Sequence, residues 1–482
     1  MAKKTLFLLG TAFTIAAVGV GVAAAVTKGF QQAPRLGIVD LVTSKNNVYS
    51  VHFDAGKTVG VRGDSAKGLV AGINGKTNHF DNIYPWSDMK TIKDDNGDYF
   101  IRIPKFYSKI DDSNGLDIAI SGTFHKGMTL NPAFLDGGRE LDYIDIAKYE
   151  ASLSKDQTVL KSIAGVMPVT TGYTLDQARV LAERNGNQLI NWRQNQALQM
   201  LFTVEFADLD SQSIMAGETQ YVSLIHEVTA EEIAAKKVAQ FTLSEDDAAL
   251  IDSETDHLEF AQANLKHVDL SYEYTKDDET VSVQETVTAK SVKLEDDVWT
   301  VTLDNPIDTS VLAEDAGIYI NFGSYNYHKT GETDGRKGSS NGASAESLET
   351  TAMNYRGIEN WWGNTWTWCD GLATYQDNDG KYICVSWDSL KNNNRDSYTR
   401  YGVENMDSSK AFEKGLYFNK LAVNESGNGY DYFNFSFSNG NYRIGFLGGG
   451  YGDAYDAGAF CVYVYNDVSS ASNGFRLSCI PQ

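Results

Sequence analysis

Four of the chain's eight tryptophans fall in one short segment, YRGIENWWGNTWTWCDG (Tyr355–Gly371). Each indole covers a large apolar area and needs a partner for its N–H group when it is buried. The Asn and Thr residues interspersed with these tryptophans supply such partners, as buried polar groups require. We therefore interpret the segment as part of a core, with a surface binding site as the alternative. Any fold for this chain has to enclose it.

Length and charge limit the classes of protein to which the chain can belong. At 482 residues it is longer than one core usually supports, and a length prior predicts about two to four domains. It contains 41 Lys and Arg residues and 64 Asp and Glu residues, which gives a net charge of −23. Such a charge repels phosphate backbones and anionic lipid headgroups, so we expect no nucleic-acid partner.

The cysteines and histidines give no sign of a metal or cofactor. Histidines are scattered, and four cysteines lie in the last quarter of the chain: Cys369, Cys384, Cys461 and Cys479. They lack the Cys-x-x-Cys spacing of zinc sites, so we expect no metal and no cofactor. One or two disulfides are an open alternative if the chain is exported, whereas a cytosolic or virion-assembled chain would carry free, mostly buried thiols.

The N-terminus carries the chain's only membrane-class segment. Thr5–Val26 is uncharged and apolar and is about as long as a bilayer-spanning helix. Two lysines precede it and favour export of the chain beyond Lys28. Because the run ends in three alanines that signal peptidase accepts, residues 1–28 are either a membrane anchor or a cleaved signal peptide. Both predict an extracytoplasmic location, secreted or at the cell surface.

The periodicity of apolar residues divides the first half of the chain. Residues 29–152 alternate short apolar and polar runs with Gly, Asn and Asp turns, which predicts a β-rich N-terminal region. Residues 153–216 place apolar side chains three and four apart, which predicts two helices. Thr174 stands where an N-cap belongs, and Gly186 is placed to end the first helix.

The second half changes composition twice, and the fold class expected for the whole chain is α+β. Residues 217–330 are strongly acidic and mix a helical piece with alternating strands, which predicts an inserted acidic α+β module. Residues 331–350 contain almost no apolar side chain, and we expect a flexible linker there. Residues 351–482 are rich in aromatic residues, Asn and Gly.

Three motifs follow one another in the C-terminal part: GNTWTW (Gly363–Trp368), GGGY (Gly448–Tyr451) and SSASNGFRLSC (Ser469–Cys479). They resemble, in order, the Gly-Asn-x-Trp-Glu-Trp, Gly-Gly-Ser-Trp and Gly-Phe-Arg elements of the formylglycine-generating-enzyme-like branch of the C-type lectin fold. Upstream segments, among them Asn82–Lys90 and Asn131–Ser152, resemble phage and prophage tail or minor structural proteins that end in such a domain. The resemblance implies a C-type-lectin-like ligand-binding part at 351–482, begun by the helices of 153–216, and a virion tail as the alternative location.

The sequence argues against an enzyme. The enzymatic branch of this family uses a cysteine pair just after Gly-Gly-Ser-Trp, whereas here the first sulfur after Tyr451 belongs to Cys461. Thr367 also replaces the signature glutamate, which removes support for an inherited calcium position. Three upstream acids suggest glycoside cleavage, but their spacing is typical of a solvated face: Asp142, Asp145 and Glu150. We expect no catalytic residues.

The stretch Tyr430–Asp456 has the composition of a binding surface. Tyrosine supplies rigid contact area, and Asn, Ser and Gly adapt to a partner. The resemblance implies the same use of the fold as in variable ligand-binding proteins of diversity-generating retroelements and in phage tail-tip adhesins. We expect glycine-flanked tyrosines and acids here to be exposed. The candidate ligand-binding residues are Asn434, Ser436, Ser438, Asn439, Asn441, Tyr442, Tyr451, Asp453, Tyr455 and Asp456.

The sequence thus predicts a ligand- or receptor-binding protein whose partner is a host-cell or environmental protein or glycan. The alternatives are a purely structural tail component and a formylglycine-generating-type or glycoside-cleaving enzyme. The sequence leaves open the ligand, homo-oligomerisation and diversification by a retroelement.

Overall fold

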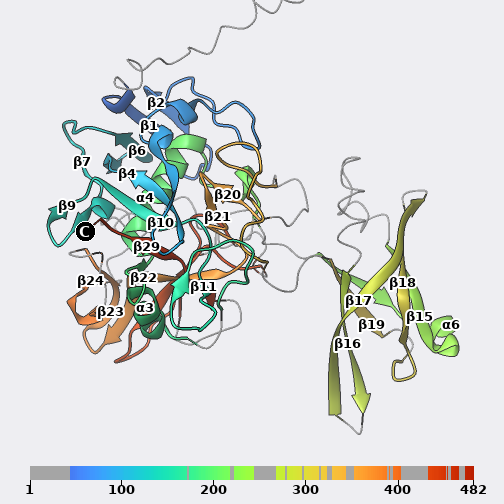
Figure 1. Ribbon diagram of the computed structural model, residues 1–482. Coiled ribbons are helices and arrows are strands. Elements are labelled where there is room, and N and C mark those ends of the chain that lie inside the picture. The colour runs from blue at the N-terminus through green and yellow to red at the C-terminus, as the bar shows by residue number, and fades with distance from the viewer. Residues whose placement is uncertain are drawn as a thin grey trace, which may run out of the picture. The chain divides into compact units, whose positions relative to one another are not determined.

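The computed structural model describes residues 44–170, 173–217, 222–243, 267–276, 279–295, 298–313, 316–322, 328–343, 352–387, 390, 394–402, 433–451, 453, 457–465 and 473–481. Lys45–Gln482 form one compact unit, which Figure 1 labels by element. The architecture is sheet-rich with few helices, which is consistent with the expected α+β class and with a β-rich fold. Thr5–Val26 lies outside the described residues, and no helix among those described is long and apolar enough to cross a membrane.

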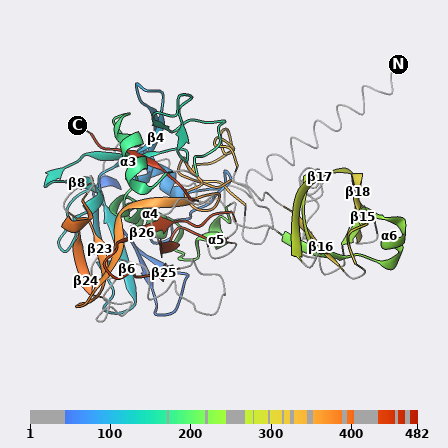
Figure 2. The ribbon, with the colours of Figure 1, turned by 90° about the horizontal axis from the view of Figure 1, so that it is seen from below.

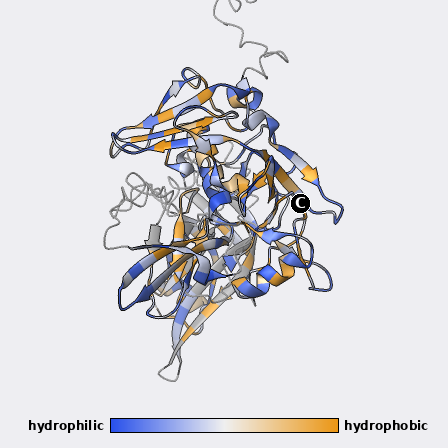
Figure 3. Ribbon diagram, turned by 90° about the vertical axis from the view of Figure 1, so that its left-hand side faces the viewer, coloured by the Kyte–Doolittle hydropathy of each residue, from blue (hydrophilic) through white to orange (hydrophobic). Residues whose placement is uncertain are grey.

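A five-stranded antiparallel sheet opens the described chain. Its order is β2 (Val61–Asp64), β1 (Val48–Phe53), β6 (Leu116–Ser121), β5 (Tyr107–Asp111) and β7 (Thr129–Leu130). Burial alternates along β1, where Tyr49, Val51 and Phe53 point inward. Figure 3 shows the same alternation as orange and blue segments along the strands. The predicted β-rich character of this region is confirmed, because alternating side chains face opposite sides of a sheet.

A second sheet joins the C-terminal strand to strands from the first 190 residues of the chain. Its order is β13 (Gln188–Leu189), β29 (Leu477–Cys479), β10 (Tyr143–Ala147), β4 (Tyr99–Pro104) and β3 (Lys90–Lys93). The C-terminal strand β29 lies between β10 and β13, beside the end marked C in Figure 1. The expected division at residue 152 is therefore wrong as a structural boundary. The paired residues of β10 and β29 are more than 300 positions apart in the chain, so the local sequence pattern does not indicate this pairing.

The third large sheet has seven strands. Its order is β24 (Thr399–Gly402), β23 (Gly380–Val385), β22 (Trp366–Asp377), β26 (Arg443–Leu447), β27 (Val462–Tyr465) and β25 (Phe433–Phe435), and β28 (Asn473–Gly474) pairs with β22. The pairs from β24 to β27 are antiparallel, whereas β25 and β28 run parallel to their neighbours.

Two main helices pack among these sheets, as predicted. The helix α3 (Leu175–Glu183) begins with a capping box in which Thr174 and Gln177 satisfy each other's backbone N–H groups. The helix α4 (Trp192–Phe206) is capped in the same way by Asn191, and all of its residues are buried. A short helix follows, α5 (Ser211–Ile214). Gly186 lies just beyond α3 with φ +76°, a conformation that glycine adopts readily.

The tryptophan segment belongs to the core, as predicted. Trp361, Trp362 and Trp368 are buried, and Trp366 is half-buried. The segment is also tied to α4 by charge, because the Arg356 guanidinium lies 2.6 Å from the Glu205 carboxylate in a fully buried pair. Such a pair withstands burial only when its remaining polar atoms are hydrogen-bonded. The phenol of Tyr355 and the amide of Asn78 supply those further bonds to Glu205: 3.1 and 2.7 Å, respectively.

The expected acidic insert forms a sheet from its own residues. Its order is β14 (Val222–Glu227), β19 (Gly317–Phe322), β16 (His267–Lys276), β17 (Glu279–Glu295), β18 (Val298–Asp308) and β15 (Lys237–Leu243), with α6 (Ala230–Ala235) between β14 and β15 in sequence. All pairs in it are antiparallel. Figure 2 shows that this sheet is strongly curved and that α6 lies beside β15.

The expected linker is wrong for residues 331–343, which are packed in place; residues 344–350 lie outside the described residues. Thr333, Ser340 and Asn341 are buried. The Glu359 carboxylate accepts hydrogen bonds from the backbone N–H of Gly331 and from the N–H and hydroxyl of Thr333. Hydrogen bonds to a buried carboxylate thus order a segment that has little apolar surface to bury.

Small elements complete the architecture. Two-residue strands pair as β8 (Leu135–Asp136) with β9 (Arg139–Glu140), β11 (Ser152–Leu153) with β12 (Leu160–Lys161) and β20 (Asn354–Tyr355) with β21 (Ile358–Glu359). The short 3₁₀ turns are η1 (His79–Asn82), η2 (Trp86–Asp88), η3 (Pro132–Phe134) and η4 (Arg395–Ser397).

Candidate functional site

One side of the seven-stranded sheet collects most of its aromatic side chains. Phe446 on β26 pairs with Trp368 and Tyr463, and Ile444 pairs with Ala373 and Tyr465. Because alternate residues of a strand share a side of the sheet, this register fixes which residues lie together. We call the half-buried and exposed aromatic residues on this side the aromatic face: Trp366, Tyr375, Tyr382, Tyr442, Tyr463 and Tyr465.

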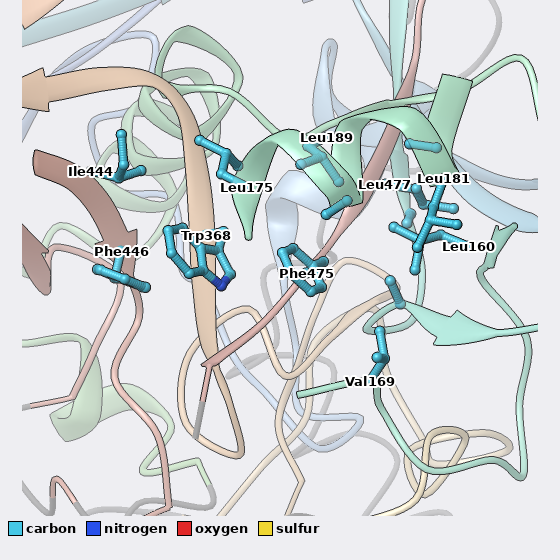
Figure 4. Close-up of a cluster of buried hydrophobic side chains, with 14 of the residues drawn as sticks. Leu160, Val169, Leu175, Leu181, Leu189, Trp368, Ile444, Phe446, Phe475 and Leu477 are labelled. Carbon is cyan, nitrogen blue, oxygen red and sulfur yellow. The ribbon is translucent and has the colours of Figure 1, made fainter. Parts of the chain in front are cut away.

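The middle of this side is covered and belongs to the core. Figure 4 shows Trp368 between Phe446 and Phe475, with Leu175 of α3 nearby. The Trp368 and Phe475 rings are stacked with centroids 6.1 Å apart. The helix α3 also contributes Leu181 and two alanines to the same cluster. Away from this cover the aromatic face is only half-buried, and Tyr465 is 41% exposed.

An arginine is stacked on two tyrosines at one border of the aromatic face. The Tyr375 and Tyr442 ring centroids are 4.8 Å apart. The Arg400 guanidinium carbon lies 4.3 Å from the Tyr375 centroid and 5.8 Å from that of Tyr442. Arg400 Nη2 donates to the Tyr442 hydroxyl at 2.7 Å, and that hydroxyl donates to Asp396 at 3.2 Å. Cation–π contact and hydrogen bonding therefore hold the guanidinium in one place.

Local contacts keep the Arg400 guanidinium charged and favour the neutral form of the Tyr442 phenol. The hydrogen bond with Tyr442 raises the pKa of Arg400 above its ordinary value, so the guanidinium stays charged. Burial raises the pKa of Tyr442, with the Arg400 hydrogen bond opposing that rise. The cluster thus holds one fixed guanidinium charge against the two tyrosine rings. Two carboxylates lie close by: Asp396, which accepts from the Tyr442 hydroxyl, and Asp377, which is 3.7 Å from Arg400.

A second aromatic group continues the face. Trp366 lies 5.9 Å from Tyr463, and Tyr463 is stacked on Tyr465 with centroids 5.5 Å apart. The Arg443 guanidinium carbon lies 5.3 Å from the Tyr465 centroid. Large aromatic surface next to arginine is the composition that interface hot spots favour.

The glycine turn was expected to be exposed, and that expectation is wrong. Gly448, Gly449 and Gly450 are buried. A Cβ on Gly448, where φ is +85°, would lie 2.8 Å from the Trp361 carbonyl oxygen, and one on Gly450 would lie 3.3 Å from the Trp366 ring. These glycines allow the turn to approach the tryptophan segment closely, a use of glycine that composition alone does not separate from an exposed loop.

Two predicted ligand residues belong to this turn and are correspondingly half-buried. The Tyr451 backbone N–H donates to the Asn364 carbonyl at 3.0 Å. The Asp453 carboxylate accepts from the Gly450 N–H at 2.7 Å. Both residues are therefore held to the scaffold near Trp366 and are half-buried, as Tyr442 is.

Other predicted residues gather at the end of the sheet. Ser436, half-buried, accepts from Arg443, whereas Asn439 and Asn441 are exposed in the turn before β26. Ser438 forms a β-bridge with Asn441, and the backbone there also meets the end of β22. Tyr442 enters the aromatic face itself. Asn434 lies in β25, but its side chain is outside the described residues, as are Tyr455 and Asp456.

Sequence reasoning missed most of the aromatic face. Trp366, Tyr375, Tyr382, Tyr463 and Tyr465 were not singled out as ligand residues, and neither was Arg400. The spacing of two between Trp366 and Trp368, and between Tyr463 and Tyr465, is a signal that they share one side of a strand. Nothing local indicates that Arg400 reaches Tyr375.

The upstream carboxylates separate into one surface acid and two buried acids. Asp142 is exposed and pairs with Lys105, as expected of a solvated face. That expectation is wrong for Asp145, which is buried and lies 2.8 Å from Arg102, and for Glu150, which is 1% exposed. Both contribute to structural networks of ion pairs and hydrogen bonds.

Glu150 is the centre of a buried hydrogen-bond network that includes the GNTWTW motif. Asn364 donates to one carboxylate oxygen, and the Thr365 backbone N–H donates to the other at 3.2 Å. Asn360 also donates, at 3.4 Å. Desolvation raises the pKa of Glu150 to about 7, although the charge of Arg476 and these hydrogen bonds oppose the rise.

The four cysteines are free thiols in the structure, so the disulfide alternative is not realised in it. Burial raises the pKa of Cys384 to about 12 and that of Cys369 well above its ordinary value. Buried thiols of this kind pack as small apolar side chains. Among the described residues, no group of three or more His, Cys, Asp or Glu side chains is arranged to hold a metal ion.

Comparison with models of known protein families and with functionally characterised proteins finds no match for this chain.

Proposed function

We propose that this protein binds a ligand through the aromatic face of its seven-stranded sheet. The observation that carries the proposal is the Arg400 guanidinium stacked against Tyr375 and Tyr442 at a half-buried border of the sheet. Aromatic residues and arginine dominate binding energy where they are rigid and partly desolvated. The small polar residues of the neighbouring turn, Asn439 and Asn441, are exposed and provide adaptable hydrogen bonds.

We further propose that the aromatic face belongs to a C-type-lectin-like domain that contains residues 153–216 and 351–482 and extends upstream to include β10 and Glu150. Contacts of the three sequence motifs with one another support this: the Gly363 N–H donates to the Gly448 carbonyl at 3.3 Å, and Trp366 pairs with Asn473. Contacts with neighbouring residues add to them. Asn364 of the first motif bonds Glu150, and Gly448 of the second lies against the Trp361 backbone. Arg476 of the third donates to the carbonyls of Glu359 and Asn360, both at 2.7 Å. The motifs thus meet around one buried region, whose role is to support the sheet.

The biological setting that we propose is a phage tail adhesin or an exported, surface-displayed binding protein. The upstream resemblance to tail proteins and the apolar N-terminal run support it. A structural tail component would use the same fold without a free ligand, so direct binding separates the two.

The test measures binding of the full chain to a panel of immobilised glycans and to isolated bacterial envelopes. Replacing Tyr375 and Tyr442 together with alanine removes two hot-spot side chains, each worth about 2 kcal/mol or more, and we expect a loss of roughly a thousandfold if they add. Tyr107→Ala is the matched control, because Tyr107 is a half-buried tyrosine of the five-stranded sheet.

Thermal melting accompanies each measurement. A double variant that still melts cooperatively but no longer binds supports the proposal. Normal binding by that double variant would show that the aromatic face is part of the scaffold only. Failure of the unmodified chain to bind any glycan or envelope would favour the structural alternative.

A further inference from the structure

The Arg400 side chain combines a fixed position with unused hydrogen-bonding capacity. It lies on the edge strand β24 and is 36% exposed. Among the described residues, its close hydrogen bond goes to Tyr442, and its contact with Asp377 is longer, at 3.7 Å. A guanidinium carries several N–H donors in a planar fork, and the fork matches a carboxylate with two parallel hydrogen bonds.

The surroundings of Arg400 suit a sugar ring. Tyr375 and Tyr382 pair across β22 and β23 and are half-buried, so they add apolar area beside the guanidinium. The C–H groups of a pyranose carry partial positive charge and pack favourably on the negative faces of aromatic rings. Asp396 is exposed next to Tyr442 and can accept hydrogen bonds from sugar hydroxyls.

The charge of the whole chain restricts the ligand further. A net charge of −23 repels an extended polyanion such as a nucleic acid or a heavily sulfated glycan. Charges farther than about 8 Å are largely screened at physiological ionic strength. A small ligand with one carboxylate therefore experiences mainly the charges of Arg400 and of the neighbouring Asp377 and Asp396, whereas a polyanion also experiences the rest of the acidic surface.

We propose that the aromatic face binds an oligosaccharide carrying an isolated carboxylate, and that Arg400 recognises the carboxylate while the tyrosine rings contact the sugar. This inference rests on the proposed function and names the ligand class for the same site. It assigns Arg400 to specificity and the tyrosines to affinity.

The experiment compares the trisaccharide sialyllactose with lactose, the disaccharide that lacks the carboxylate-bearing sugar. Binding to the full chain is measured by saturation-transfer NMR and by titration. We expect sialyllactose to bind at least about tenfold more tightly than lactose, since a hydrogen bond to a charged group contributes roughly 1.5–3 kcal/mol. The preference should weaken as salt is added.

Two variants test the role of Arg400. Arg400→Ala should abolish the preference for sialyllactose while leaving the weak binding of lactose in place. Arg400→Lys should keep only part of the preference, because lysine retains the charge but loses the planar fork. Arg184→Ala is the control, since Arg184 is an exposed arginine at the end of α3 and should not affect the preference.

Several outcomes would overturn the inference. Equal affinity for the two sugars would do so, as would a preference that survives Arg400→Ala. Equal weakening of both sugars by Arg400→Ala would mean that Arg400 only supports Tyr442. Tighter binding of heparin than of sialyllactose would contradict the charge argument. If sialyllactose fails while glycans or envelopes bind in a Tyr375- and Tyr442-dependent manner, this inference is wrong and the proposed function stands.

Discussion

Replacing Glu150 with glutamine should remove a pH dependence from the stability of the fold. Glu150 is buried, and desolvation raises its pKa from an ordinary 4.5 to about 7. The folded state therefore holds the proton more tightly than the unfolded state. The stability linked to this group is fully present below about pH 4.5 and is lost as the pH rises through about 7.

The size of the effect follows from the interval between those two pKa values. A difference of one unit between the folded and unfolded pKa values corresponds to about 1.4 kcal/mol, so the complete loss of stability is roughly 3 kcal/mol. Between about pH 5 and about pH 8 most of that change, roughly 2–3 kcal/mol, should occur. The glutamine side chain also places an N–H₂ group near the donors Asn360 and Asn364, which adds a destabilisation that does not vary with pH.

Urea unfolding of the full chain at both pH values tests the prediction. The free energy of unfolding of the unmodified chain should fall relative to that of Glu150→Gln as the pH is raised. Glu183→Gln, at an exposed position of α3, is the control and should show no such change. If the difference between the unmodified chain and Glu150→Gln is the same at both pH values, the carboxyl is not shifted as its burial implies.

Two further predictions concern the core and the way the two ends of the chain combine. Trp368→Ala should lower the free energy of unfolding in urea by about 3–5 kcal/mol, because Trp368 is fully buried. Trp366 is half-buried, so Trp366→Ala should lower it less and should weaken glycan binding. Equal losses of stability in the two variants would contradict this ranking. A fragment of residues 351–482 should not fold by itself, because β29 pairs with β10 and β13, and Arg476 donates to the Ala147 carbonyl at 3.0 Å. A cooperative thermal transition of that fragment by circular dichroism would show that the upstream strands are dispensable.

Local chemistry made several features predictable from the sequence. Thr174 caps α3, because its hydroxyl accepts from the Gln177 backbone N–H and the Gln177 side chain accepts from the Thr174 backbone N–H. This capping box spans four residues, so it can be recognised in the sequence. The acidic insert was recognisable in the sequence because its composition differs from that of its surroundings. In the structure its strands pair with one another. The burial of Trp361 and Trp362 followed from the size of the indole. The expectation that the Asn and Thr residues beside them pair with their N–H groups is wrong, because these groups donate to Asn195 Oδ1 at 2.9 Å and to the Met215 carbonyl at 3.2 Å.

The turn Gly448–Gly450 shows where composition misleads. Glycine fits an exposed loop and a tight approach to another backbone equally well, and only the position of Trp361 decides between the two. The same holds for residues 331–343, whose polar side chains do not order the chain until the Glu359 carboxylate is placed among them.

The sequence by itself determined the two main helices and the burial of Trp361, Trp362 and Trp368, because these depend on periodicity, capping and side-chain size over short distances. Only the tertiary structure decided that β29 lies between β10 and β13, and that Arg400 meets Tyr375 and Tyr442. Those contacts depend on strand register and on segments distant in the chain. A shift of one residue in register would turn each side chain to the opposite side of the sheet, so the aromatic face exists only once the sheet is assembled.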